Sequence, residues 1–166
     1  MNPQLTQLLS EYAEDHTHPT NRSFHKVGVP LVLFHILAML DWVHIYPSVD
    51  IVTEATGAYT LSLGHIFAVL VAIWYIRLSL KLAAVVGVAA LLCFAISPHV
   101  GFMGVISVTI LAWVFQLIGH GVYEKRTPAF LRNLLQLLVG PLFMAALLLG
   151  EWPIKDNGLS KEQSAK

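Results

Sequence analysis

Three histidines lie within one short polar segment, Asp15–His25, directly before the first long apolar run of the chain. His16 and His25 stand on either side of Pro19 and Asn21, two residues that favour turns. A loop at this place can therefore direct both imidazoles toward one point. Neutral imidazole is a preferred ligand of iron, zinc and copper, so the segment predicts part of a metal site.

A second polar segment, Gln116–Arg126, lies at the end of a later apolar run. On a helix, Gln116, His120 and Glu124 recur every four residues and share one face. Ligands drawn from both segments would join two distant parts of the chain around one ion. We therefore expect a redox metal to be held by His16, His25 and His120.

The polar neighbours of these histidines have expected roles of their own. Glu124 is either a fourth ligand or a hydrogen-bonding partner of the ligands. Asn21 and Gln116 are expected to orient the ligands or the substrate. Four basic residues surround the expected site. They can pair with a substrate carboxylate, although membrane topology alone also explains their positions: Arg22, Lys26, Lys125 and Arg126.

Each histidine taken alone also fits a helix cap or a residue in the lipid headgroup zone. His18 is either an extra ligand or a solvated residue. His35 lies inside the first apolar run, where a hydrogen bond to a neighbouring helix explains it as well as a place in the pocket does. A second polar cluster is conceivable at the other end of the apolar segments, from Asp41, His44, His65 and His99.

The composition indicates a membrane protein. Of 166 residues, 56% are hydrophobic and 12% are charged, whereas a soluble domain typically has about 25% charged residues. The formal net charge is zero, so no basic field would attract nucleic acid. The length predicts one catalytic domain over residues 1–150, followed by a polar tail over 151–166.

Apolar periodicity predicts an all-α, multi-pass transmembrane bundle preceded by an amphipathic helix. Leu5, Leu8 and Leu9 belong to an apolar stripe over residues 3–16, on a helix expected to lie on the bilayer or on the bundle. A loop is expected over 17–22, with Asn21 or Ser23 capping the next helix. Four to five spans of roughly 20 residues are expected, at about 24–46, 59–80, 82–97, 100–120 and 130–150.

The last predicted span contains Gly140 and Pro141, which should kink it, so both a full crossing and a re-entrant segment remain open. Lysine and arginine precede the first span, follow the second and follow the fourth, whereas the loops between have none. This alternation predicts a cytoplasmic start. It places the three expected ligands at the cytoplasmic face.

Two segments, Asp15–Pro30 and Trp113–Phe143, resemble the signature segments of the 2-hydroxy fatty acid dioxygenase family. The first pattern is a histidine, an asparagine five residues later and a histidine four residues beyond, as in His16, Asn21 and His25. The second pattern reads W-x-x-Q-F-x-G-H-x-x-F-E-K-x-x-P-A. It is met by Trp113, Gln116, Gly119, His120, Glu124, Lys125, Pro128 and Ala129.

The chain departs from the family pattern at four positions. Leu117 and Tyr123 stand where the family has phenylalanine, while Asp15 and His18 stand where tyrosine and asparagine are common. The changes at Asp15 and His18 would alter the polar surroundings of the metal. The middle of the chain resembles the family only in having hydrophobic spans.

The resemblance implies an Fe(II)-dependent enzyme that uses O2 to shorten a long-chain 2-hydroxy fatty acid by one carbon, the α-oxidation of fatty acids. Family members act in the endoplasmic reticulum in phytosphingosine breakdown, and bacteria have relatives. The expected location is therefore the endoplasmic reticulum of a eukaryote or the cytoplasmic membrane of a bacterium. The acyl chain would lie among the spans, surrounded by membrane lipid, with its polar head at the iron.

Three other functions fit parts of the sequence. A small transporter or proton channel without a redox metal would use a relay of His35, Asp41, His65 and His99. A di-metal lipid hydroxylase or desaturase would need more histidines than the expected cytoplasmic face offers. A structural scaffold would need neither polar segment. Chain-length preference and oligomeric state are not specified by the sequence.

Overall fold

The computed structural model describes residues 2–45, 51–53, 57–59, 61–125 and 127–152, and their fold is all-α, as the sequence predicts. A short antiparallel hairpin of β1 (Ile51–Thr53) and β2 (Gly57–Tyr59) is the exception. Within the described residues the α-helices are α1 Pro3–Glu14, α2 Pro19–Asp41, α3 Leu63–Leu78, α4 Leu80–Ile96, α5 Phe102–Ile118 and α6 Leu135–Leu148. Short helical turns of other types are η1 Ser97–His99, η2 Gly119–Glu124 and η3 Ala129–Leu131.

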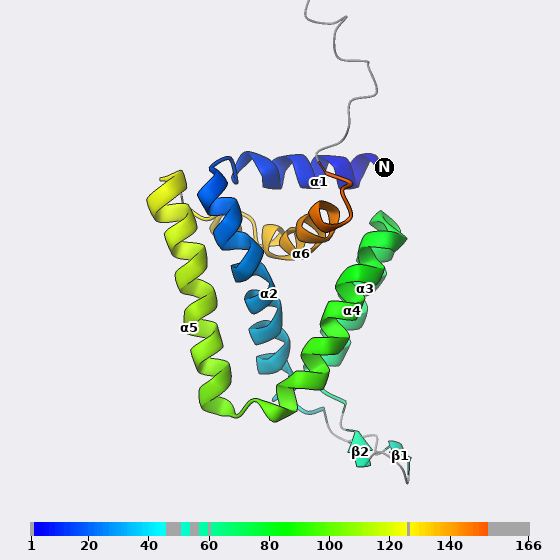
Figure 1. Cartoon of the computed structure of the whole chain (residues 1–166). Coiled ribbons are helices and arrows are strands. Elements are labelled where there is room, and N and C mark those ends of the chain that lie inside the picture. Colours follow the sequence, from blue (N-terminus) through cyan, green and yellow to red (C-terminus); the bar gives the residue numbers. More distant parts are fainter. Residues whose placement is uncertain (1, 46–50, 54–56, 60, 126, 153–166) are drawn as a thin grey trace, which may run out of the picture.

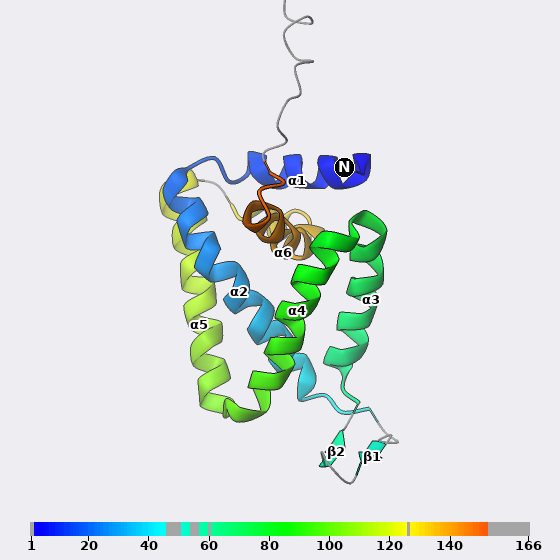
Figure 2. The same ribbon diagram turned by 45° about the vertical axis from the view of Figure 1, so that its right-hand side comes forward.

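The helices α2, α3, α4 and α5 stand side by side, and α1 lies across one end of them (Figure 1). α2 packs along α5, and α3 packs along α4. α6 lies beneath α1, inside the same end of the molecule, and the hairpin projects from the opposite end (Figures 1 and 2). The start of α2 and the end of α5 therefore meet below α1, at what we call the α1 end.

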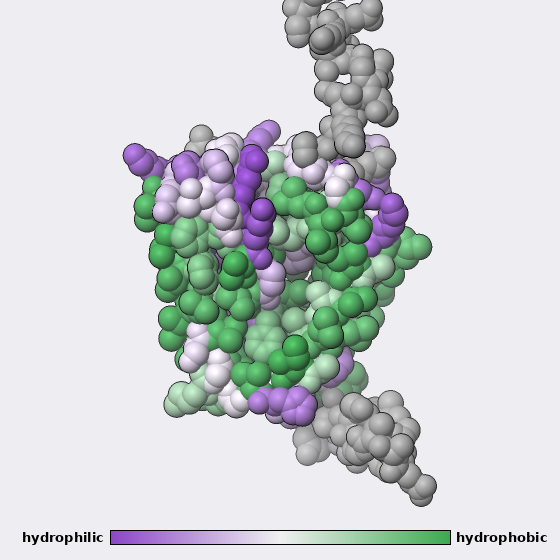
Figure 3. Space-filling view, in the orientation of Figure 1, coloured by the Kyte–Doolittle hydropathy of each residue, from purple (hydrophilic) through white to green (hydrophobic). Residues whose placement is uncertain are grey.

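The outside of the upright helices is largely apolar. Three helical stretches are long and apolar enough to cross a membrane, namely Pro19–Asp41, Leu80–His99 and Phe102–Glu124. Exposed apolar side chains on the upright helices include Leu70 of α3, Leu91 of α4 and Ile110 of α5. Figure 3 shows a broad apolar belt with hydrophilic residues concentrated at the α1 end. Such a surface is the mark of a membrane protein.

The predicted loop over residues 17–22 is wrong, because α2 already begins at Pro19. A proline at the first helical position is favourable, since the N–H that it lacks would have had no partner in the helix. His18 is the N-cap, and its side chain accepts a hydrogen bond from the backbone N–H of Thr20. Asn21, a predicted cap, instead lies within the helix and is fully buried.

Two other predicted boundaries also differ. The second span was expected from residue 59, but α3 begins at Leu63, where Ser62 and His65 form a reciprocal cap. The last apolar run was expected over 130–150, but α6 has 14 residues and does not stand with the upright helices. At roughly 1.5 Å per residue it is too short to cross the hydrocarbon. The number of crossings stays a prediction.

The apolar face of α1 packs against the bundle. Of the two expected positions, on the bilayer or on the bundle, the structure shows the second. Leu5 and Leu9 are 1% and 0% exposed and belong to one core with residues of α3, α4 and α6. Tyr12, one turn further along, is buried in the same core. Burying side chains of this size contributes on the order of 1.5–3 kcal/mol each. This packing fixes the end of α1, and with it the position of His16.

A polar cluster ties three helices together at the end opposite α1. Asp41 of α2 accepts hydrogen bonds from the hydroxyls of Ser62 (2.6 Å) and Ser97 (3.4 Å). The Nδ1 atom of His65 lies 3.6 Å from the Asp41 carboxylate. Two of the four residues expected in a second cluster thus meet, and serines that the sequence analysis left out complete it. These contacts cap α3 and hydrogen-bond α2 to the neighbouring helices.

Candidate metal centre

Three histidines from distant parts of the chain meet at the α1 end. His16 follows α1, His25 lies in the second turn of α2, and His120 lies in η2 after α5. One nitrogen of each lies within 4.8 Å of the others. The three residues are 3–4% exposed. The structure thus brings together the three histidines expected as ligands.

Hydrogen bonds fix the orientation of two of these rings. The Nδ1 atom of His16 faces the carbonyl oxygen of Tyr12, and that of His25 lies 3.0 Å from the carbonyl oxygen of Asn21. A carbonyl only accepts, so both Nδ1 atoms donate and both Nε2 atoms keep a lone pair. The Nε2 of His16 is buried and has no hydrogen-bond partner. Metal-binding histidines have this arrangement, because the bond at one nitrogen holds the other toward the metal.

The surroundings of His16 keep its ring neutral. Burial, together with the electrostatic effect of the nearby His25 ring, lowers the pKa of His16 to about 3. Tyr12 stacks on the ring, with centroids 4.0 Å apart and planes within 12°. A neutral imidazole is the form that binds a metal. At neutral pH no proton therefore has to leave His16 before an ion binds.

His120 is presented by an unusual turn. α5 ends at Ile118, and the backbone continues as the π-helical turn η2. Such turns are rare and occur frequently at functional sites. Lys125 ends the turn in the left-handed region, at φ 51°. An ideal Cβ on Gly119 would lie 2.2 Å from the Oδ1 atom of Asn21, so the turn and α2 approach this closely only because residue 119 has no side chain.

Glu124 holds η2 against the segment between α1 and α2. Its carboxylate accepts hydrogen bonds from the hydroxyl of Thr17 (2.9 Å), the backbone N–H of His18 (2.7 Å) and the amide of Asn21 (3.2 Å). Glu124 does not belong to the group of close ligand atoms. Of the two expected roles, the contacts favour the hydrogen-bonding partner.

The two amides expected to orient ligands or substrate occupy different positions. Asn21 is fully buried between Glu124 and Gly119, and its Oδ1 has no hydrogen-bond partner. Gln116 lines a cavity together with the three histidines. Asn21 is therefore placed to position the histidine-bearing segments. Gln116 is placed to contact a molecule in the cavity.

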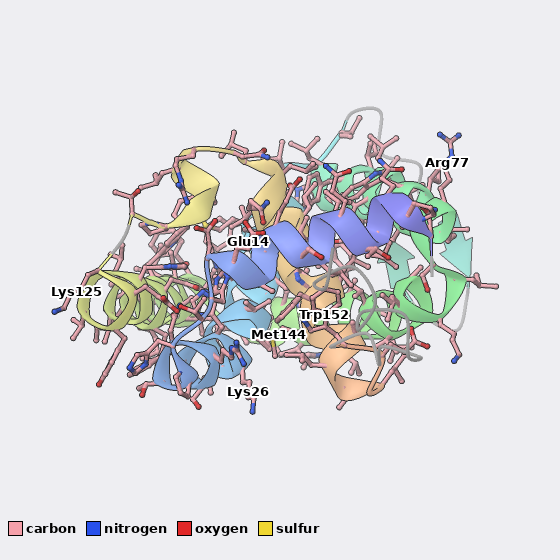
Figure 4. All side chains as sticks on the ribbon, turned by 90° about the horizontal axis from the view of Figure 1, so that it is seen from above. Glu14, Lys26, Arg77, Lys125, Met144 and Trp152 are labelled. Atoms are coloured by element: carbon pink, nitrogen blue, oxygen red, sulfur yellow. The ribbon has the colours of Figure 1, made fainter. Side chains whose placement is uncertain are left out.

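The four basic residues expected around the site do not share one position. Arg22 borders a small pocket beside His16 and His25, and its Nε donates to the backbone carbonyl of His16 at 2.7 Å. Figure 4, which looks onto the α1 end, shows Lys26 and Lys125 at the edge of the molecule with their side chains directed outward. Arg126 lies outside the described residues. Arg22 is thus the described candidate that lies next to the histidines.

Histidines elsewhere in the described chain lie apart from the group of three. The ring of His18 caps α2 and lies 5.2 Å from that of Tyr123. His35 bonds the carbonyl oxygen of Leu31 in its own helix, at 3.2 Å, and not a neighbouring helix. Of the residues considered for a proton relay, Asp41 and His65 meet, while His99 is exposed.

A cavity of about 160 Å³ extends from the histidines into the bundle between α2, α3, α4 and α6. The three clustered histidines line one end of it, and its other polar lining residues are Tyr12, Tyr75, Gln116 and Gln136. The hydroxyl of Tyr75 donates to the carbonyl oxygen of Leu138. The remaining lining side chains are almost all aliphatic or aromatic. The cavity therefore suits a molecule with one polar head and a hydrocarbon body.

Gln136 is a cavity residue that the sequence analysis missed. It is the polar side chain of the otherwise apolar α6, it is 7% exposed, and its Oε1 has no hydrogen-bond partner. A buried amide oxygen without a partner is costly and needs an explanation. A lone amide in an apolar run was a signal in the sequence. Its position could be recognised only once α6 was seen to lie beneath α1.

Comparisons with known proteins indicate the family of the chain. Residues 3–152 match the family model described as Mpo1-like, 2-hydroxy-palmitic acid dioxygenase Mpo1-like. A curated relative from Saccharomyces cerevisiae, 2-hydroxy-palmitic acid dioxygenase MPO1, is 35% identical over 145 residues, covering 84% of this chain and 76% of the relative. No solved structure matches the chain.

Proposed function

The chain belongs to the Mpo1-like, 2-hydroxy-palmitic acid dioxygenase family, and from that premise we propose that it is a membrane Fe(II)-dependent dioxygenase that shortens long-chain 2-hydroxy fatty acids by one carbon. The observation that carries this proposal is the cluster of His16, His25 and His120 at the polar end of an apolar cavity.

The residues present fit an iron ion. Three neutral imidazoles are suitable ligands for Fe(II), and the partnerless Nε2 of His16 would gain a bond on metal binding. When bound, Fe(II) supplies the redox chemistry that activates O2. Zinc and copper accept the same ligands, so the identity of the metal belongs to the proposal and follows from the dioxygenase family.

The rest of the cavity would position the substrate. Its apolar walls take up the acyl chain and keep water away from the histidines, while the amides of Gln116 and Gln136 face the polar head. In the overall reaction the bond between C1 and C2 breaks, C2 becomes the new carboxyl carbon and C1 leaves as carbon dioxide. Four electrons pass from the substrate to O2, so no other reductant is needed.

We propose that the chain crosses the membrane several times, with the α1 end at the cytoplasmic face. The basic residues of the α1 end support this orientation, because cytoplasmic loops are enriched in lysine and arginine. Arg22, Lys26 and Arg77 are exposed, and the last two are labelled at the rim in Figure 4. A substrate dissolved in the bilayer would then present its carboxylate at the depth of the histidines.

The direct test is O2 uptake by anaerobically purified, Fe(II)-loaded protein. We expect uptake with 2-hydroxypalmitic acid, a product one carbon shorter, and no uptake with palmitic acid. Protein without metal should be inactive and regain activity with Fe(II). Absence of uptake by the iron-loaded protein, or a product of unchanged length, would contradict the proposed function.

Gln136→Leu tests whether Gln136 contacts the polar head of the substrate. We expect the KM for 2-hydroxypalmitic acid to rise roughly 2- to 10-fold, since a neutral hydrogen bond contributes about 0.5–1.5 kcal/mol. The iron content should not change. Because the substitution removes a buried oxygen without a partner, the Tm of the substrate-free protein should not fall.

Palmitic acid is the matched control ligand, since it lacks the hydroxyl that would donate to Gln136. Its binding should be the same in the wild type and in Gln136→Leu. A lower Tm with an unchanged KM would show that Gln136 has only a structural role.

A further inference from the structure

The cavity continues well beyond the histidines, between α2, α3 and α4. We call this part the acyl pocket, and its lining residues are Leu33, Ile36, Phe67, Ala68, Gly87 and Ala90. At 1.5 Å per residue, Ala90 lies about 10 Å further along α4 than Ala83, which lines the same cavity nearer the α1 end. Figure 3 shows the apolar surface between α2 and α4 as a recess. The pocket is therefore deep and is bordered by apolar groups.

Most of the α4 residues that border the cavity are small, and Val86 is the larger one among them. Ala83, Gly87 and Ala90 follow one another at helical spacing and all line the cavity. The opposite face has large residues, and Val88 and Leu91 are 58% and 70% exposed. Three of the four α4 residues that line the cavity are thus glycine or alanine. Larger ones there would fill the space.

Gly87 has no structural requirement for glycine. An ideal Cβ at this position meets nothing within 4 Å, and its φ lies outside the left-handed region. By contrast, a Cβ on Gly28, Gly64 or Gly140 would come within 3.0–3.2 Å of a neighbour. Glycine inside a helix is unfavourable by roughly 0.5–1 kcal/mol relative to alanine. What glycine provides at position 87 is empty volume inside the acyl pocket.

The polar end of the same cavity points to a ligand independently. The Oε1 of Gln136 and the Nε2 of His16 are buried and have no hydrogen-bond partner, and both residues line the cavity. A molecule that enters the cavity can satisfy the Gln136 oxygen with a hydroxyl. The rest of that molecule then lies against apolar lining residues, toward Gly87 and Ala90.

We propose that the acyl pocket holds the hydrocarbon chain of the substrate and that the empty volume at Gly87 sets the longest chain the protein accepts. This inference rests on the proposed function for the identity of the polar head. It adds the course of the chain and a residue that determines length selectivity. A large side chain at position 87 would close the pocket before the acyl chain reaches Phe67, Ala68 and Ala90, which line the part farther from the α1 end.

The test is Gly87→Leu, compared with wild type over a series of acids from 2-hydroxyoctanoic to 2-hydroxystearic acid. Each methylene group buried contributes roughly a fourfold gain in affinity. We expect wild type to favour long chains and Gly87→Leu to lose at least about 10-fold in kcat/KM for the longest acids. The shortest acids should react as before.

Two matched variants distinguish blocking of the acyl pocket from other effects of the substitution. Gly87→Ala improves helix propensity and leaves most of the space, so its selectivity should stay close to wild type. Val88→Leu adds bulk to the neighbouring, lipid-facing position and should leave the profile unchanged. If Gly87→Leu does not fold, Ala90→Leu narrows the same pocket and should give the same shift.

Binding of the corresponding non-hydroxylated fatty acids, measured by displacement of a fluorescent fatty acid, gives a readout without turnover. A length profile that shifts in Gly87→Leu, together with no O2 uptake by wild type, would keep the acyl pocket and reject the dioxygenase. Turnover with an unchanged profile in Gly87→Leu would reject the role of Gly87. Wild type that neither binds the fatty acids nor oxidises the 2-hydroxy acids would reject both.

Discussion

Replacing His16, His25 or His120 by alanine is expected to abolish stable iron binding and to lower O2 uptake at least ~100-fold. Loss of a residue that only supports a ligand typically costs 10–100-fold in metal affinity or activity, so loss of a ligand should cost more. The measurement is iron per protein after anaerobic purification, followed by O2 uptake with 2-hydroxypalmitic acid. Any one of the three substitutions should suffice, because each removes one ligand from the same cluster.

His35→Ala is the matched control for this series. His35 is 4% exposed, like the proposed ligands, and its Nδ1 bonds the carbonyl four residues earlier, as in His16 and His25. It lies outside the cluster, so His35→Ala should retain its iron. Full iron retention in the His16, His25 and His120 variants would reject the site. Equal iron loss in His35→Ala would show that a buried histidine is needed only for folding.

The spacing of residues was enough to predict which histidines meet. His16 and His25 belong to one polar segment before the first apolar run, and His120 lies at the end of a later apolar run, followed by basic residues. Both features bring polar segments to the same end of an apolar bundle, whatever the details of packing. The histidines His44, His65 and His99 lie toward the other end for the same reason, and none belongs to the cluster.

Local geometry could not be predicted in the same way. A proline can end one element or begin the next, and only the cap formed by His18 shows that Pro19 begins α2. The π-helical turn η2 depends on its contact with Asn21 and on three hydrogen bonds to Glu124. Such contacts join residues about a hundred positions apart, so no local pattern specifies them.

The role of the last apolar run likewise depends on tertiary packing. The hydropathy of this run alone would fit a membrane-spanning helix. In the structure, however, α6 lies beneath α1 and packs against α1 and α4. Gly140 allows this approach, since an added Cβ would lie 3.2 Å from the hydroxyl of Tyr12. The position of α6 brings Gln136 into the cavity. Gln136 was therefore missed together with the packing of its helix.

Gly119→Ala is expected to reduce iron affinity about 10- to 100-fold, although the residue binds no metal. Its backbone is helical, at φ −54° and ψ −53°, so alanine would otherwise be favourable there by roughly 0.5–1 kcal/mol. The added Cβ, however, would lie 2.2 Å from Asn21 Oδ1 and 3.5 Å from a ring carbon of His25. Overpacking of this kind costs about 1–3 kcal/mol, so the clash outweighs the gain in helix propensity.

Gly121→Ala is the control within the same turn, because a Cβ at Gly121 meets nothing within 4 Å. It should bind iron as wild type does. The cause can be tested further in an Asn21→Ala background, where the clashing oxygen is absent. There, Gly119→Ala should cost much less in iron affinity than it does alone, a coupling that a double-mutant cycle measures. An equal loss in both backgrounds would mean that Gly119 acts on His120 through the turn itself and not through its contact with α2.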